Sequence, residues 1–459
     1  MSWLQGYVSW LQDKLNTLSG IIWGEYLLIP LLAIVGIFLT IGLQAMPWRQ
    51  LPLALQTLWQ GRKETPRFKG DISPFQALMT ALSATIGTGN IAGVATAIYF
   101  GGPGAIFWMW IIALFGMATK YAEAVLAVSY RETDALGNYV GGPMYYIRNG
   151  LGENWRWMAA SFAFFAMFAA FGIGNMVQSN SVADELYSSF DVPTWLTGTT
   201  MAILAALVII GGIKRIAQVA SKIVPFMAIA YITAALIIVI LNFEKIPGVI
   251  SLVIQSAFTG SAASGGFLGA SIWMAIRFGV ARGIFSNEAG LGSAPIAHAA
   301  AKTNDPVKQG MVAMLGTFID TLIICSLTAF VIILTGAWES GLNGAPMSSL
   351  AFSIGLYGYG SYVVSFGLVL FAFTTILGWS YYGERCASYL FGTNIIIYYR
   401  ILWIIAIFTG AVVKLELVWA FADVLNGLMA LPNLLALLLL SPVVFSKTRQ
   451  YFNNRNSKW

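Results

Sequence analysis

Residues 83–93 read Ser-Ala-Thr-Ile-Gly-Thr-Gly-Asn-Ile-Ala-Gly, and they stand inside an apolar stretch that runs from about Phe75 to Phe100. Glycine, threonine and asparagine at this density weaken a helix in its middle. An unpaired backbone amide in hydrocarbon costs several kcal/mol, so such a break persists only where other polar groups replace the lost hydrogen bonds. We interpret the stretch as a membrane helix that is interrupted at a binding site.

A second interruption of the same kind occurs at residues 283–293, Gly-Ile-Phe-Ser-Asn-Glu-Ala-Gly-Leu-Gly-Ser. Small residues in a membrane helix also allow close packing of helices, and a single glycine cluster would favour that interpretation. Two clusters that each mix glycine with asparagine and a hydroxyl residue instead favour a shared binding site.

The composition indicates an integral membrane protein. Of 459 residues, 58% are hydrophobic and only 10% are charged, and the mean hydropathy is +0.75. A soluble domain carries roughly 25% charged residues. Eleven stretches approach the ~20 apolar residues that a helical span needs, and they predict an all-α, polytopic fold: residues 26–45, 75–99, 104–129, 157–180, 195–212, 223–241, 265–297, 311–335, 361–382, 396–413 and 417–443.

Basic residues predict the orientation and a repeat. Nineteen lysines and arginines fall in one set of alternate loops and three in the other, which places the N-terminus outside and the C-terminus in the cytoplasm. Spans two and seven then enter from opposite faces, and the groups of five that they open (spans 2–6 and 7–11) have inverted topology. Interrupted helices at matching places in two inverted repeats are typical of transporters with a midplane binding site.

This plan predicts one transmembrane transporter domain over residues 1–459. Residues 1–73 hold an N-terminal helix, a peripheral first span and a basic cytoplasmic loop. Residues 74–242 form the first repeat, 243–445 the second, and 446–459 a cytoplasmic tail. Apolar side chains at helical spacing in the N-terminal helix suit an amphipathic helix lying in the interface: Leu4, Val8, Leu11, Leu15 and Leu18.

Three further motifs carry a resemblance. Residues 101–116, Gly-Gly-Pro-Gly-Ala-Ile-Phe-Trp-Met-Trp-Ile-Ile-Ala-Leu-Phe-Gly, are similar to the signature of the alanine or glycine:cation symporter family. Residues 141–146, Gly-Gly-Pro-Met-Tyr-Tyr, and 286–292, Ser-Asn-Glu-Ala-Gly-Leu-Gly, resemble that family as well. The resemblance implies the inverted-repeat fold of the leucine transporter and uptake of alanine, or glycine, with sodium across the cell membrane. It implies no organic cofactor, no obligatory protein partner and no nucleic acid.

A zwitterionic amino acid needs donors for its carboxylate and acceptors for its ammonium group. Free amides at the start of a half-helix bind anions, and unwound carbonyls accept from cations. We therefore expect the amides of Thr88 and Gly89 to bind the carboxylate. The carbonyls of Thr85, Phe285 and Ser286 are expected to bind the ammonium group.

Other side chains are expected to line the same site. Span four offers Gly172 for a close approach to the backbone and Gln178 as both donor and acceptor. Phe171, Phe285 and Trp379 are candidates for its walls, although aromatic residues at helical spacing are more often packing residues. The predicted substrate site comprises Thr85, Thr88, Gly89, Asn90, Phe171, Gly172, Gln178, Phe285, Ser286, Asn287, Thr375 and Trp379.

Sodium prefers several oxygen ligands, by extension from other hard cations. Similarity to the leucine-transporter fold implies one ion between the carbonyls of Ser83 and Ile86 and the hydroxyls of Thr374 and Thr375. The alternative for both threonines is a hydrogen bond to their own helix. A second ion site would use Asn90 with Ser286 or Asn287.

Charged side chains within spans cost at least about 2.5 kcal/mol at the bilayer centre. Arg277, Arg282 and Glu288 in span seven, Asp320 in span eight and Asp423 in span eleven are candidates for ion pairs or gates. One histidine and two scattered cysteines disfavour a membrane-embedded enzyme. Proton coupling in place of sodium, and a passive channel, remain alternatives.

Overall fold

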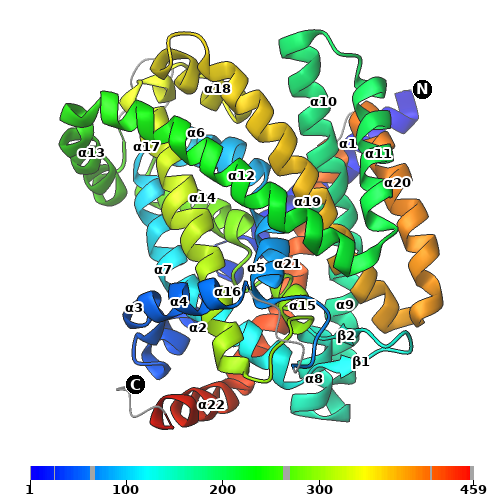
Figure 1. Ribbon diagram of the computed structural model, residues 1–459. Helices are drawn as coiled ribbons and strands as arrows, with labels where there is room; N and C mark the ends of the chain where they lie inside the picture. Colours follow the sequence, from blue (N-terminus) through cyan, green and yellow to red (C-terminus); the bar gives the residue numbers. More distant parts are fainter. Residues whose placement is uncertain (1, 25, 63–67, 262–268, 414–415, 455–459) are drawn as a thin grey trace.

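The computed structural model describes residues 2–24, 26–62, 68–261, 269–413 and 416–454. Helices dominate these residues (Figure 1), and β1 (Glu132–Thr133) pairs with β2 (Tyr139–Val140) in one short antiparallel hairpin. The all-α class is confirmed. The predicted start of span seven at residues 265–268, part of the basic loop at 63–67 and the end of the tail at 455–459 lie outside the described residues.

The helices follow one another along the chain with short connections. The first half contains α1 (Ser2–Ile22), α2 (Leu28–Gly42), α3 (Met46–Arg49), α4 (Leu51–Gln60), α5 (Pro74–Thr85), α6 (Val94–Gly101), α7 (Gly104–Ser129), α8 (Pro143–Leu151), α9 (Arg156–Phe171), α10 (Val177–Phe190), α11 (Thr194–Ile209) and α12 (Gly212–Leu241). The second half contains α13 (Ile246–Thr259), α14 (Ile272–Asn287), α15 (Ala294–Ala299), α16 (Pro306–Thr317), α17 (Ser326–Leu334), α18 (Ala345–Gly355), α19 (Gly360–Phe391), α20 (Ile396–Val412), α21 (Glu416–Leu439) and α22 (Ser441–Asn453).

Each of the eleven predicted stretches overlaps at least one of these helices. Among the described residues, seven helices are long and apolar enough to cross a membrane, and a bent pair raises the number to eight. Helices α2 and α11 are apolar but shorter. The structure thus supports a polytopic membrane protein, while eleven spans and two repeats stay predictions.

Span two is broken where its sequence predicts. Ser73 and Gln76 form a capping box that starts α5, and the helix ends at Thr85. A π-helical turn, η1 (Gly89–Gly93), and α6 then continue in a direction bent by 55° from α5. The chain therefore presents backbone groups inside a buried segment.

Span seven is also broken, but later than its sequence suggests. Helix α14 continues through Gly283 to Asn287, and the break begins at Glu288, whose φ of 56° lies in the left-handed region. A Cβ at Gly283 would come within 3.0 Å of the Ile112 side chain of α7. Gly283 thus serves close helix packing rather than the interruption.

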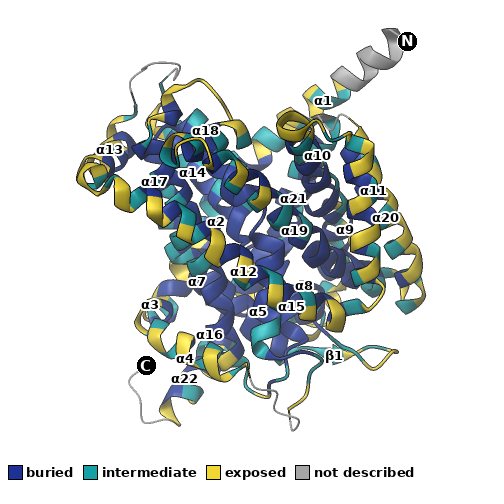
Figure 2. Ribbon diagram, turned by 45° about the horizontal axis from the view of Figure 1, so that its top comes forward, coloured by how far each residue is buried: buried dark blue, intermediate teal, exposed yellow. Residues whose placement is uncertain are grey.

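The two broken spans lie in the interior of the helix bundle. Helix α7 packs against α14 and α16, while α5 packs against α12 and α19. Figure 2 shows α7 largely buried, with exposed residues on the outer sides of α11 and α20. Large apolar side chains are exposed there, as a lipid-facing surface requires: Ile203, Leu207, Ile401 and Ile405.

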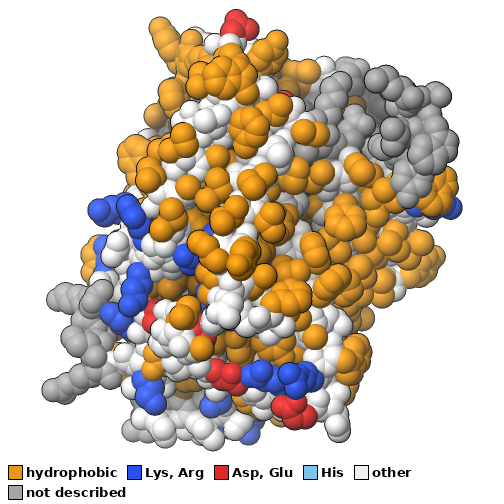
Figure 3. Space-filling model, turned by 90° about the vertical axis from the view of Figure 1, so that its right-hand side faces the viewer, with side chains coloured by type: hydrophobic (Ala, Val, Ile, Leu, Met, Phe, Trp, Pro, Cys, Tyr) orange, Lys and Arg blue, Asp and Glu red, His pale blue; other side chains and the backbone are white. Residues whose placement is uncertain are grey.

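Charged and apolar side chains are separated on the surface. Figure 3 shows hydrophobic side chains over much of one face and most of its lysines and arginines towards the lower part. Helices α1 and α22 lie at opposite ends of the molecule (Figure 1). Both arrangements are compatible with the predicted orientation.

Candidate functional site

At its break, span two loses a helical hydrogen bond because a backbone amide donates to a side chain instead of to a backbone carbonyl. Gly87 N donates to Asn90 Oδ1 at 2.9 Å. In an unbroken helix the same amide would donate to the carbonyl of Ser83. The carbonyl of Ser83 is therefore left without its helical partner, inside a part of α5 that is fully buried.

Span four supplies a side chain that faces this break. Gln178 Nε2 donates to Thr88 Oγ1 at 3.3 Å and to the carbonyl of Ile173 at 3.0 Å. Gln178 Oε1 lies 3.5 Å from Thr88 N. The structure thus brings Gln178 and Thr88 together, as expected for a shared site.

Span nine meets span two at Ile86. Thr375 Oγ1 lies 3.3 Å from the Ile86 carbonyl, and it also donates to Phe371 O at 2.9 Å within its own helix. Ser83 lies beside the same helix, because a Cβ at Gly378 would come within 2.8 Å of Ser83 Oγ. Ser83 and Ile86 of span two therefore both lie against span nine, and Thr375 reaches the Ile86 carbonyl.

Thr374 does not join this group. Its hydroxyl donates to Phe371 O at 3.0 Å and points to Met227 Sδ of α12 at 3.5 Å. Neighbouring residues on a helix point about 100° apart, so only one of two adjacent threonines faces α5. The structure therefore does not bring the Thr374 hydroxyl to Ile86, and this hydroxyl makes the hydrogen bond to its own helix that was the alternative.

The end of α14 presents two carbonyls to the same region. In a continuous helix, Ala289 N and Gly290 N would donate to Phe285 O and Ser286 O. Ala289 N instead donates to Asn287 Oδ1 at 2.9 Å, and Gly290 N donates to Glu123 Oε1 at 3.1 Å. The carbonyls of Phe285 and Ser286, in the last turn of α14, therefore do not accept the backbone hydrogen bonds that a continuous helix would provide.

The two broken spans contact each other at Gly89, directly after the break in span two. A Cβ there would come within 3.3 Å of both Phe285 Cδ1 and Ser286 Cα. Thr85 ends α5 close by, with its hydroxyl bonded back to Ala81 O at 3.3 Å. Most of the predicted substrate site is buried here: Thr85, Thr88, Gly89, Asn90, Gln178, Ser286, Asn287, Thr375 and Trp379.

The buried carboxylate of Asp320 lies among the residues of the predicted second ion site. Asp320 Oδ1 accepts from Asn90 Nδ2 at 2.7 Å, and Oδ2 accepts from Ser286 Oγ and Thr321 Oγ1, both at 2.8 Å. Asn287 Nδ2 donates to Thr321 Oγ1 at 3.0 Å. The structure therefore brings Asn90, Ser286 and Asn287 together as predicted.

Of the two roles expected for Asp320, the described residues do not support the ion pair, and the gate stays a prediction. No lysine or arginine among the described residues lies within ion-pairing distance of its carboxylate. A buried carboxylate without a cationic partner is costly unless hydrogen bonds or a bound cation stabilise it. The side chain thus belongs to a polar, cation-attracting group rather than to an ion pair.

Glu123 of α7 holds the broken part of span seven in place. Its Oε1 accepts from Gly290 N and Gly292 N, both at 3.1 Å, and from Asn433 Nδ2 at 2.7 Å. These contacts replace the hydrogen bonds that a continuous helix would provide. Glu123 is fully buried, and no local pattern in the sequence connects it with span seven.

Phe171 and Gly172 face away from the central site. The Phe171 ring packs against Tyr399 and Trp403 of α20, with ring centroids 5.0 and 5.2 Å apart. A Cβ at Gly172 would come within 2.4 Å of Ala422 Cβ of α21. The structure does not bring these two residues to the central site: Phe171 ends α9 and Gly172 begins a π-helical turn, η3 (Gly172–Met176), that packs against α20 and α21.

Gly174, in the same turn, allows the close approach to the backbone of span four that was expected at Gly172. A Cβ there would come within 2.2 Å of Trp379 Cβ. The absent side chain lets the buried Trp379 pack directly on the backbone of span four. Trp379 also packs edge-on against Tyr382, with ring centroids 5.6 Å apart.

Sequence comparison places this geometry among known transporters. A profile described as the sodium:alanine symporter family matches residues 8–458. The sodium/alanine symporter AgcS of Methanococcus maripaludis is 51% identical over 96% of this chain and 98% of its own length. An uncharacterised transporter of Haemophilus influenzae is 52% identical over 96% of both chains. The probable sodium/glutamine symporter GlnT of Bacillus subtilis is 39% identical over 97% of this chain and 92% of its own.

Comparison with solved structures identifies the same fold at low sequence identity. The crystal structure of MhsT in complex with L-phenylalanine aligns with a TM-score of 0.54 at 12% identity, over 83% of this chain and 99% of that chain. A manganese transporter of Eremococcus coleocola aligns with a TM-score of 0.50 at 13% identity, over 82% and 78%. These likenesses support the leucine-transporter type of fold.

Proposed function

Since the chain belongs to the sodium:alanine symporter family, we propose that it takes up alanine, and glycine as a second substrate, together with sodium. The chain is an integral membrane transporter rather than an enzyme, and its family carries out cation-coupled amino acid symport. The observation that carries the proposal is the meeting of two broken helices at Gly89 and Ser286, beside the carboxylate of Asp320.

The substrate is proposed to lie between the two breaks. Its carboxylate would accept from the amides of Thr88 and Gly89, where the second half of span two begins and the helix dipole favours an anion. Its ammonium group would donate to the carbonyls of Thr85, Phe285 and Ser286. The displaced amides at Ala289 and Gly290 support this, because they leave two of those carbonyls available.

Two cation sites are proposed beside the substrate. The first uses the carbonyls of Ser83 and Ile86 with the hydroxyl of Thr375, which lies 3.3 Å from the Ile86 carbonyl.

The second uses Asn90, Ser286 and Asn287, with Asp320 as its charged ligand. Asp320 bonds directly to Asn90 and Ser286 and reaches Asn287 through Thr321. Oxygen ligands of this kind suit a hard cation.

Coupling follows from the shared backbone of span two. A ligand moves a conformational equilibrium only when it binds the two states unequally. Substrate and cation would both draw on the few residues from Ser83 to Asn90, so each would favour the same arrangement of the break. A tenfold sodium gradient supplies about 1.4 kcal/mol, and a potential of 100 mV about 2.3 kcal/mol per charge.

The wider architecture completes the proposal. Helices from α5 to α12 would form the first repeat and those from α13 to α21 the second, with α1 and α2 outside both. The N-terminus would lie outside the cell and the C-terminus in the cytoplasm, because most basic residues fall in one set of loops. Alternating access would then rest on movement of the two repeats around the paired breaks.

Proton coupling is a second candidate, and Asp320 is the observation that favours it. A buried carboxylate without a basic partner can be neutralised by a proton instead of being compensated by a metal cation. The test is uptake of labelled alanine by proteoliposomes that contain the purified protein, with sodium and proton gradients imposed separately. Accumulation driven by sodium supports the proposal, and accumulation driven by pH alone contradicts its sodium part.

Thr375→Ala is expected to raise the sodium concentration for half-maximal uptake about fivefold. The loss of one neutral oxygen contact is worth roughly 1 kcal/mol, and this corresponds to about that factor. Thr374→Ala is the matched control, because the Thr374 hydroxyl faces Met227. Equal effects of the two variants on the sodium dependence would remove Thr375 from the ion site.

Gln178→Ala is expected to weaken alanine binding about tenfold, since it removes the side chain that orients Thr88. Equilibrium binding of labelled alanine at saturating sodium measures this. Asn175→Ala serves as control, because Asn175 lies in the preceding turn η3 of span four and donates to Trp403 O at 2.9 Å. Unchanged affinity in Gln178→Ala would place the glutamine outside the site.

A further inference from the structure

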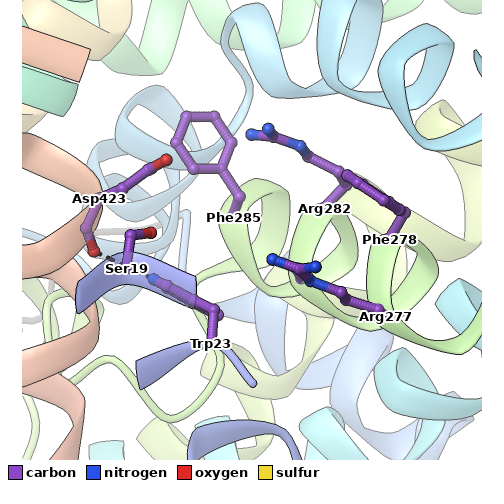
Figure 4. A pocket seen from close by; sticks show the side chains of 8 residues that line it. Ser19, Trp23, Arg277, Phe278, Arg282, Phe285 and Asp423 are labelled. Atoms are coloured by element: carbon purple, nitrogen blue, oxygen red, sulfur yellow. Dashed lines mark hydrogen bonds between the residues drawn. The ribbon is translucent and has the colours of Figure 1, made fainter. Parts of the chain in front are cut away.

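Arginines line more than one pocket of the molecule. Figure 4 shows a pocket with Arg277 and Arg282 of α14 on one side and Asp423 of α21 on the other. Among the described residues, no ion pair joins these three side chains to an opposite charge. The ring of Phe285 lines this pocket and also contacts Gly89. The pocket therefore adjoins the central site that is described above.

A second pocket with arginines lies apart from that site. It is a cavity of about 210 Å³ between the β1–β2 hairpin, the turn from α11 to α12, the end of α19 and the start of α20. None of its lining residues belongs to the predicted substrate or ion sites. A cavity of ~10–15 Å³ already holds one water, so this one has room for a group of several heavy atoms. Its charged lining is mainly basic, with Lys214, Arg385 and Arg400 against Glu384.

The two arginines of this basic pocket share their carboxylate. Glu384 accepts from Arg400 Nε at 2.5 Å and Nη2 at 3.1 Å, and from Arg385 Nη2 at 2.6 Å. Asp134 of the hairpin accepts from Arg385 Nη1 at 2.9 Å. Together with Lys214, three cations then face two carboxylates, so an excess of positive charge remains.

Arg385 also has a donor that is not used. The side chain is only 5% exposed, and among the described residues its Nε donates to no acceptor. A buried donor without an acceptor is costly, the more so in a charged group. An oxygen atom of an anionic ligand in the cavity would satisfy this donor.

The first turn of α12 adds backbone donors to the basic pocket. No side chain caps this 30-residue helix, and Gly212, Ile213 and Lys214 line the cavity. The free amides and the positive end of the helix dipole therefore lie beside the arginines. Gly212 has a φ of 63°, and a Cβ there would come within 3.4 Å of Arg400 Nη2. Helix amides and guanidinium groups are both typical donors to phosphate.

The basic pocket adjoins an apolar surface. Arg400 Nη1 donates to the carbonyl of Ile210, which directly follows α11, at 3.1 Å. Ile210 is exposed, and so are Ile397 and Ile401 of α20. Figure 3 faces the side on which α11 and α20 lie in Figure 1, and it shows hydrophobic side chains above charged ones. Basic pockets at the edge of a lipid-facing surface bind lipid head groups.

We propose that the basic pocket binds the phosphate group of an anionic phospholipid from the surrounding membrane. Arg385 Nε, Arg400, Lys214 and the first amides of α12 hold the phosphate oxygens, and the acyl chains lie along α11 and α20. The lipid thereby joins the start of α12 to α19 and α20. In the orientation proposed above, it belongs to the cytoplasmic leaflet. The inference goes beyond the transport function and does not depend on it.

The first test is equilibrium binding of labelled phosphatidylglycerol to the purified protein in detergent. Phosphatidylcholine is the matched lipid, because its head group carries a compensating positive charge. The unsubstituted protein should bind phosphatidylglycerol saturably and about tenfold more tightly than phosphatidylcholine. Lys214→Gln should weaken phosphatidylglycerol binding about fivefold, the effect of one basic residue at an anionic lipid surface. Lys214→Glu should remove most of the preference while both arginines stay in place.

Lys308→Gln is the matched control. Lys308 is exposed and occupies the same position in the first turn of α16 that Lys214 occupies in α12. In α16, however, Asp305 accepts from the amides of Val307 at 3.0 Å and Lys308 at 3.3 Å. Because this helix start is capped, the preference for phosphatidylglycerol should be unchanged in Lys308→Gln.

The second test is thermal unfolding in detergent, with and without phosphatidylglycerol. A ligand that binds only the folded protein raises its unfolding temperature. The rise should be similar in the unsubstituted protein and Lys308→Gln, and much smaller in Lys214→Glu. Without the lipid all three should unfold at similar temperatures, and this comparison separates a loss of binding from a loss of folding.

The outcomes decide both the site and its ligand. Equal affinity of Lys214→Glu and the unsubstituted protein for phosphatidylglycerol would refute the site. Glycerol phosphate, which has no acyl chains, should compete only weakly with the lipid. If it competes as well as phosphatidylglycerol itself, the pocket binds a soluble phosphate ester and the lipid assignment is overturned. No gradient is applied in these experiments, so a negative result leaves the transport proposal standing.

Discussion

Asp320→Asn is expected to raise the sodium concentration for half-maximal alanine uptake by at least tenfold. Hydrogen bonds and contacts that involve a charged group are worth about 1.5–3 kcal/mol, which corresponds to roughly 10- to 150-fold. Asparagine keeps the size of the side chain and one acceptor oxygen, so Asn90, Ser286 and Thr321 retain partners. The expected loss is therefore one of cation affinity rather than of folding.

The measurement is initial alanine uptake by proteoliposomes over a wide range of sodium concentrations, with alanine saturating. Asp184→Asn is the matched control, because it removes an acidic group at an exposed position of α10. An unchanged sodium dependence in Asp320→Asn would exclude the carboxylate as a cation ligand. Loss of uptake driven by pH, with the sodium-driven uptake intact, would instead assign Asp320 to a proton.

Glu123→Ala is expected to destabilise the protein by about 3 kcal/mol or more. The carboxylate is the acceptor for Gly290 N, Gly292 N and Asn433 Nδ2. Each buried donor that is left without a partner costs about 1–3 kcal/mol. Because two of these donors belong to the broken part of span seven, the local structure of the site is expected to loosen as well.

The measurement is thermal unfolding of the purified protein in detergent, together with equilibrium binding of alanine. Glu123→Gln is the comparison, since the amide oxygen can accept from the same donors; its unfolding temperature should remain close to that of the unsubstituted protein. Equal unfolding temperatures for Glu123→Ala and the unsubstituted protein would show that the carboxylate does not hold span seven.

Local sequence was sufficient to locate the two breaks within a few residues. Glycine and asparagine in apolar surroundings weaken a helix wherever the rest of the chain goes, so residues 86–88 and 288–293 could be found without coordinates. Even so, Gly283 lies before the break and allows α14 to pack closely against α7. The difference arises because a glycine serves both purposes, and only its neighbours in space distinguish them.

The sequence did not show towards which neighbouring helix each side chain points. Thr374 and Thr375 are adjacent and chemically identical, yet only Thr375 reaches Ile86. Phe171 packs against Tyr399 of α20 rather than at the central site. Helix rotation depends on how all neighbouring helices pack, so a choice between adjacent positions is decided by the whole bundle.

By itself, the sequence determined that this protein is a helical membrane transporter with two interrupted spans, because the apolar content and the local helix-breaking residues act over short distances along the chain. Only the tertiary structure decided which polar groups meet at those interruptions. Asn90 and Asp320 are separated by 230 positions, and Glu123 and Gly290 by 167. Such pairs are set by the packing of distant helices, for which no local pattern provides a signal.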